Sequence, residues 1–103
     1  MCERATYLAY KNLSAIRAPA DTKKSILDVL AEAALQLSPS KIFKDARPIV
    51  EYEAYKRGEP APHLGQVDWL AVSKLARWLA IIRRDCGIEK LNRAVTFLLS
   101  TIK

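Results

Sequence analysis

The sequence VDWLAVSKLARWLAIIRRDCGIEKLNRAVTFLLSTI, residues 67–102, decides the fold class of this chain. Apolar residues recur in its first half at three- and four-residue spacing, at Val67, Leu70, Ala71, Leu75, Trp78, Leu79 and Ile82. This spacing predicts one face of an amphipathic helix of about five turns. Two arginines close the pattern, where cations suit a helix end, and Gly87 then predicts the left-handed residue that stops the helix.

A further helix is predicted directly after Gly87, from about Ile88 to Ile102. Its apolar face consists of Leu91, Ala94, Val95, Leu98 and Ile102. Because a glycine joins two amphipathic helices without a long linker, residues 67–102 are expected to form a helix-Gly-helix hairpin.

The residues before the hairpin also have helical spacing. A first helix is predicted over about 3–16 and ends before Pro19, and a second begins at an N-cap Asp21 and reaches Leu37. Ser38 and Pro39 predict a new start. Because Pro48 interrupts the helical pattern of residues 40–57, either two short helices (40–46 and 48–57) or one kinked helix is expected.

Residues 58–65 contain two glycines and two prolines and are predicted to form a loop. No segment alternates polar and apolar residues as a strand would. We therefore expect a single all-α domain over residues 1–103, a bundle of four or five helices in which this loop separates the N-terminal part from the hairpin. The expected core includes Leu8, Leu13, Ile26, Leu30, Leu75, Trp78, Ile82, Leu91, Val95 and Leu98.

Composition places this 103-residue chain among globular proteins, with half its residues hydrophobic and a net charge of +6. It holds no run of about 20 apolar residues and no apolar leader, which predicts a cytoplasmic protein without a membrane span. Cys2 and Cys86 are expected to be reduced thiols. The alternative, in a hyperthermophile, is a disulfide between them. Scarce Asn and Gln favour such a thermophilic source.

The residues offer little for catalysis. His63, the single histidine, follows Arg57 at a spacing found in some helical ribonucleases, but Gly58, Pro60 and Pro62 lie between them. No glycine-rich phosphate loop and no cluster of metal-ligating residues is evident. We therefore expect no enzyme, no catalytic residues, no cofactor and no metal.

Two surfaces of the hairpin are candidates for binding. Its cations predict contacts to RNA or DNA phosphates; these candidates are Lys74, Arg77, Arg84, Lys90 and Arg93. Trp69 lies beside Ala76 and Ala80, and a large aromatic next to small residues suits the docking of another helix. That helix could come from the same chain, from a second copy or from another protein.

The hairpin resembles the C-terminal domain of the archaeal flagellum (archaellum) accessory proteins of the C/D/E group over residues 67–100. Trp78 and Leu79, Gly87, Leu91 and Phe97 reproduce the intervals of that family. The resemblance implies an archaeal, cytoplasmic scaffold protein that has no enzymatic activity. An interaction subunit of a larger assembly is therefore the expected function.

The alternative is a protein that binds the nucleic-acid backbone. Small basic helical subunits of nucleoprotein complexes, such as RNA-guided effector, viral or chromatin complexes, have a similar size and charge. Phosphate contacts by the hairpin cations would support this function.

Overall fold

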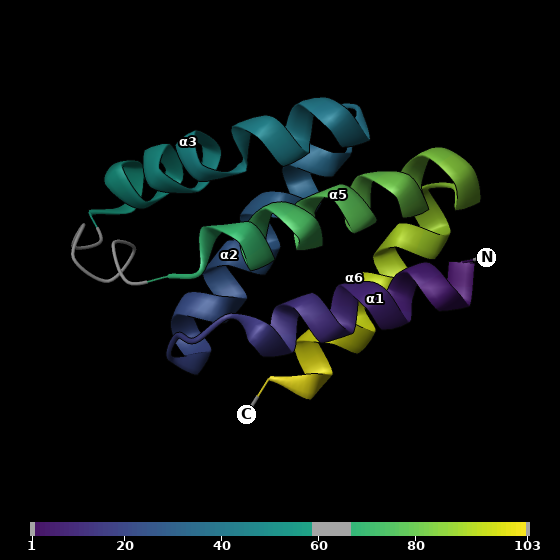
Figure 1. Ribbon diagram of the computed structural model, residues 1–103, viewed down its shortest axis with the longest axis horizontal. Helices are drawn as coiled ribbons and strands as arrows, with labels where there is room; N and C mark the ends of the chain where they lie inside the picture. The colour runs from purple at the N-terminus through teal and green to yellow at the C-terminus, as the bar shows by residue number, and fades with distance from the viewer. Residues whose placement is uncertain (1, 59–66, 103) are drawn as a thin grey trace.

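The structure, a computed structural model, describes residues 2–58 and 67–102. This part of the chain forms five α-helices and no strand, which confirms the all-α fold class (Figure 1). The helices are α1 (Cys2–Ala15), α2 (Ala20–Ala34), α3 (Pro39–Arg57), α5 (Trp69–Cys86) and α6 (Ile88–Thr101). None of them is both long and apolar enough to cross a membrane.

Helix α5 is the centre of the bundle. It packs against each of the other four helices, most extensively against α1 and α3, which flank it on two sides (Figure 1). Its side chains Leu75, Leu79 and Ile82 are completely buried. The five-turn amphipathic pattern of the sequence therefore belongs to the element that packs against all the other described helices, as burial of a wide apolar face requires.

The predicted core is largely the observed one. The predicted residues that are buried are Leu13, Ile26, Leu30, Leu75, Ile82, Leu91 and Leu98. Leu8, Trp78 and Val95 were also predicted, but they are only partly buried. Trp78 and Val95 pack against the edge of the core cluster, because they lie at the margins of the apolar faces of α5 and α6.

The helix ends follow from local chemistry. The Ser38 hydroxyl accepts a hydrogen bond from the Lys41 N–H (3.3 Å), and Pro39 occupies the first position of α3. The Asp68 carboxylate caps α5 by accepting bonds from two backbone N–H groups. The predicted cap at Asp21 is wrong, because α2 already begins at Ala20, with Pro19 before it, and has no side-chain cap.

Helix α3 continues through Pro48, so the kinked single helix is the better of the two alternatives. It ends at Gly58, whose left-handed backbone (φ 73°) lets its N–H bond the last turn. Residues 59–65 of the predicted loop, His63 among them, lie outside the described residues.

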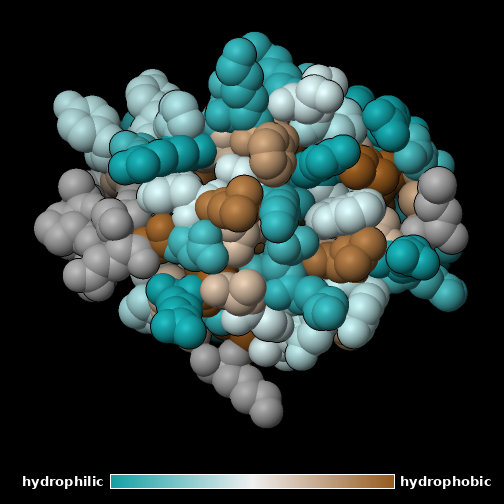
Figure 2. Space-filling model, viewed as in Figure 1, coloured by the Kyte–Doolittle hydropathy of each residue, from teal (hydrophilic) through white to brown (hydrophobic). Residues whose placement is uncertain are grey.

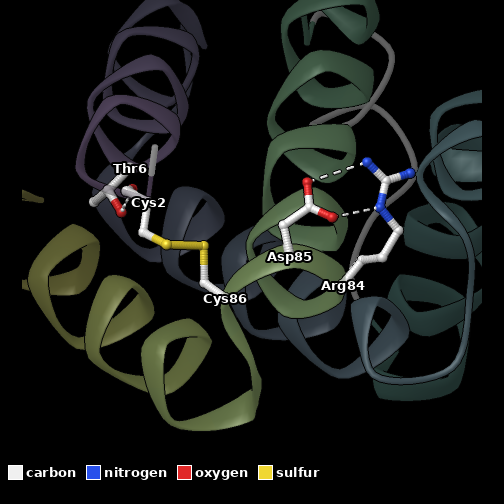
Figure 3. The surroundings of a disulfide bond; sticks show 5 residues. All are labelled: Cys2, Thr6, Arg84, Asp85 and Cys86. Carbon is white, nitrogen blue, oxygen red and sulfur yellow. Dashed lines mark hydrogen bonds and ion pairs between the residues drawn. A yellow bond between two sulfur atoms is a disulfide. The ribbon is translucent and has the colours of Figure 1, made fainter.

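A disulfide joins the start of α1 to the end of α5, between Cys2 and Cys86 (Figure 3). Their Cα atoms lie 6.1 Å apart, within the range that a disulfide spans. The expectation of two reduced thiols is therefore wrong. The sequence does not reveal the pairing because the two cysteines are 84 positions apart, and only the packing of α1 along α5 brings them together.

Candidate functional site: the groove between α1 and α6

A groove opens between α1 and α6, which both pack on α5 but hardly touch each other. We call it the α1/α6 groove; its volume is about 460 Å³. It is lined by Cys2, Glu3, Thr6, Tyr7 and Tyr10 of α1, Ile82 of α5, and Lys90, Arg93, Ala94 and Phe97 of α6. The groove therefore has one wall from α1, one from α6 and a floor from α5.

Aromatic side chains form much of the walls. Tyr10 and Phe97 meet across the groove, with ring centroids 6.3 Å apart in a tilted arrangement. Tyr7 and Phe97 keep 55% and 50% of their surface exposed, although large aromatic side chains contribute most when buried. The buried Ile82 side chain closes the floor. The groove therefore presents unburied aromatic surface inside a concave site, which is the form of a binding site.

The charged residues of the groove are mainly cations. Lys90 and Arg93 lie three residues apart on α6 and line it, and Glu3 is its acidic residue. Neither cation forms an ion pair with a described residue. On the α1 wall, the Lys11 ammonium lies 5.7 Å from the Tyr7 ring centre. The groove therefore combines an apolar interior with a positive edge.

The structure divides the five predicted nucleic-acid contacts between different surfaces. Lys90 and Arg93 line the α1/α6 groove, whereas Arg77 lies over the Phe43 ring of α3 at 5.9 Å. Lys74 is exposed one turn before Arg77. Sequence spacing placed these cations on one hairpin, but the turn at Gly87 directs the two helices to different neighbours.

Arg84 binds its sequence neighbour Asp85 on the side of α5 that faces away from the disulfide (Figure 3). The guanidinium Nε and Nη2 donate to the two carboxylate oxygens at 2.8 and 3.2 Å. These hydrogen bonds lower the pKa of Asp85 and raise that of Arg84. Arg84 is therefore already engaged, although an exposed pair of this kind contributes little to stability.

The expected docking surface at Trp69, Ala76 and Ala80 is largely occupied by the chain itself. Ala76 and Ala80 are 0% and 1% exposed, which removes them from the surface. Trp69 is partly buried, and the Arg47 guanidinium of α3 lies 5.3 Å from the centre of its ring. Of the three sources that the sequence left open, a helix of the same chain is the one observed against Trp69.

The aromatic residues of the α1/α6 groove were not among the predicted sites. Tyr7 and Tyr10 flank the apolar face of the first helix, and Phe97 widens that of the last one. Such flanking aromatics are a signal that an apolar face is wider than its own bundle needs. The sequence could not show that these two faces meet, since α1 and α6 lie at opposite ends of the chain.

On the face shown in Figure 2, hydrophobic side chains form separate spots between hydrophilic ones. Residues 2–58 and 67–102 contain no group of three or more side chains that could hold a metal ion. Comparison of the chain with protein-family models, curated proteins and solved structures finds no match.

Proposed function

We propose that this protein is a non-enzymatic interaction subunit that binds another protein through the α1/α6 groove. The observation that carries the proposal is the aromatic groove itself, where Tyr7 and Phe97 remain half exposed beside a buried floor. Aromatic side chains in a concave, partly desolvated site are typical anchors of protein interfaces. The resemblance of the hairpin to archaellum accessory proteins favours the same class of function.

A cytoplasmic location remains part of this proposal, and it places a condition on the source. Cytosolic proteins rarely keep disulfides, except in hyperthermophilic organisms. The Cys2–Cys86 bond and the scarcity of Asn and Gln are both compatible with such a source. An archaeal thermophile would satisfy both the location and the bond.

The test compares two tyrosines in similar surroundings. Tyr7 on the groove and Tyr52 on α3 are 55% and 62% exposed, and each has a lysine ammonium over its ring. Tagged wild type, Tyr7→Ala and Tyr52→Ala proteins are purified from native cells, and the bound proteins are quantified by mass spectrometry. Only Tyr7→Ala is expected to deplete partners, by about tenfold, as loss of an interface anchor does.

Equal recovery of the same proteins by all three forms would reject the groove as the docking surface. Thermal unfolding followed by circular dichroism checks that both variants remain folded. Light scattering over a range of concentrations shows whether the partner is a second copy of this chain.

Binding to the nucleic-acid backbone is a second candidate, favoured by Lys74 and Arg77. These exposed cations lie three residues apart on α5 and form no ion pair with a described residue. If they contact phosphates, affinity for duplex DNA or RNA should fall steeply with salt. Lys74→Ala/Arg77→Ala should reduce the slope of log affinity against log salt by about 2. Absence of binding by the wild type at low salt would exclude this candidate.

A further inference from the structure

The α1 residues that line the α1/α6 groove extend from Cys2 to Tyr10, and this length limits what the groove can hold. The Tyr10–Phe97 ring pair joins its two walls at one point, and the Cys2–Cys86 disulfide joins the start of α1 to the end of α5. Between Cys2 and Tyr10 the α1 wall rises about 12 Å, which is slightly more than two turns of helix. The groove therefore fits a short segment of a partner, two to three turns long, and not an extended surface.

The positive charge of the groove edge determines the sign of the charge that the partner segment should carry. Lys90 and Arg93 stand beside the apolar interior without an acidic partner among the described residues. Glu3, the acidic residue of the groove, forms no ion pair with either cation, and Glu51 and Glu53 of α3 pair with cations of their own helix. Carboxylates of another molecule are therefore the groups that would form ion pairs with these two cations.

The spacing of the two cations suits a helix. Lys90 and Arg93 lie at positions i and i+3 of α6, and therefore point to the same side of that helix. A partner helix lying along α6 presents its own carboxylates at i and i+3 or i+4 at a matching rise. Its neighbouring apolar row would then face the exposed Tyr7 and Phe97 side chains.

We infer that the occupant of the α1/α6 groove is a short acidic amphipathic helix of a partner protein. It inserts a large apolar side chain between Tyr7 and Phe97 and sets carboxylates against Lys90 and Arg93. This inference rests on the proposed function, because it names the partner of the same groove. A nucleic-acid strand is the competing occupant, since its phosphates would also satisfy the two cations.

Two labelled peptides test whether the groove prefers a negatively or a positively charged partner. Both are 15-residue helices with the same leucine row; one carries glutamates beside that row and the other carries lysines. Fluorescence anisotropy measures their affinities at constant salt. The wild type is expected to bind the glutamate peptide at least tenfold more tightly, and amide NMR shifts should change at Tyr7, Ala94 and Phe97.

The chain provides a matched control for charge. Lys90→Glu/Arg93→Glu and Lys74→Glu/Arg77→Glu each reverse a Lys–Arg pair at i and i+3, so both lower the net charge equally. The first variant should reverse the preference and bind the lysine peptide more tightly. The second should keep the preference for glutamate. If the two variants behave alike, general charge and not the groove determines binding, and the inference fails.

The remaining outcomes separate this inference from the proposed function. If both peptides bind equally well and Tyr7→Ala weakens both, the groove docks a helix but acidity does not select it. If binding is insensitive to Tyr7→Ala, or if neither peptide binds at about 1 mM, the acidic-helix inference is overturned. Displacement of the glutamate peptide by a single-stranded oligonucleotide would instead assign the groove to nucleic acid.

Discussion

Gly87 sets the geometry of the hairpin with one residue. It ends α5 by donating its N–H to the Arg83 carbonyl (3.2 Å), and it precedes the first residue of α6. Its backbone has φ 94° and ψ 168°, which differs from the left-handed helical conformation that the sequence predicts. This region of conformational space is open to glycine almost alone. This turn therefore requires glycine more strictly than a helix end in the left-handed helical conformation does.

Replacing Gly87 with alanine should lower the free energy of unfolding by about 1–3 kcal/mol, the usual strain of a residue forced into that region. A Cβ atom at this position meets no other atom within 4 Å, so the backbone alone causes the loss. Urea unfolding monitored by circular dichroism measures it. A variant as stable as the wild type would show that the turn accepts another conformation.

Gly58 provides the comparison. It lies in the left-handed region (φ 73°, ψ 18°), which asparagine tolerates better than alanine does. Gly58→Asn should therefore lose less stability than Gly58→Ala. Gly87→Asn should lose as much as Gly87→Ala, because its conformation does not suit asparagine either. If asparagine restores stability at position 87, the assigned backbone conformation is incorrect.

Trp69 illustrates what single residues reveal and what they hide. Its position beside Ala76 and Ala80 predicts a face against which a helix packs, since small residues allow close approach. The sequence cannot identify that helix, because Arg47, which lies over the Trp69 ring, belongs to α3 and is distant in sequence. The indole Nε1 is buried and finds no hydrogen-bond partner among the described residues, which no sequence pattern indicates.

At the scale of elements, periodicity predicts the helices well and their interruptions poorly. α5 and α6 are predicted almost to their ends because both have an apolar face and Gly87 lies between them. The continuity of α3 is harder to predict, since Pro48 removes a backbone N–H and disfavours the helix locally. Ala46 and Val50 are both buried on either side of it, and their packing keeps the helix continuous.

Pro48→Ala should therefore stabilise the protein. Alanine restores the missing hydrogen bond and relieves the clash, a gain of about 3 kcal/mol in a helix interior. The more flexible unfolded chain offsets about 1 kcal/mol of it, which leaves a net gain of about 2 kcal/mol. Urea unfolding measures the gain, and an exposed site such as Pro48 adds no loss of packing.

Pro39 is the control for this prediction. It is buried at the first position of α3, where its missing N–H has no partner to lose. Pro39→Ala should consequently lower the stability, by about 1 kcal/mol or less. If Pro39→Ala gains as much stability as Pro48→Ala, the gain does not come from the interruption at Pro48, because the more flexible unfolded chain lowers the stability of both variants.

The α1/α6 groove and the disulfide exist only at the scale of the whole molecule. Tyr7 and Phe97 lie 90 residues apart in sequence, and each alone resembles an ordinary edge position of a helix. Their meeting depends on how α1 and α6 are both held by α5. Sequence reasoning therefore reached the fold class and most of the core, whereas the candidate site needed the packing of three helices.

The disulfide should contribute strongly to the stability of the bundle. Cys2 and Cys86 close a loop with a sequence separation of 84 residues, and cross-linking so long a loop removes much of the entropy of the unfolded chain. The loop-entropy relation gives about 4.5 kcal/mol. This is a large part of the total of about 5–15 kcal/mol that holds a typical domain together.

Cys2→Ala/Cys86→Ala should therefore lower the free energy of urea unfolding by about 4–5 kcal/mol. Each single variant should lose nearly as much as the double variant, because either change removes the same bond. Wild type in excess reductant should match them, whereas reductant should leave the double variant unaffected. Equal stability of oxidised wild type and double variant would mean that the bond does not constrain the unfolded chain.

The loss of stability should also be local. Thr6, whose hydroxyl donates to the Cys2 carbonyl (2.9 Å), lies in the turn of α1 that the bond fixes. Amide hydrogen exchange at Thr6 and Tyr7 should then accelerate more than exchange in α3, which would show that the disulfide also holds one wall of the α1/α6 groove.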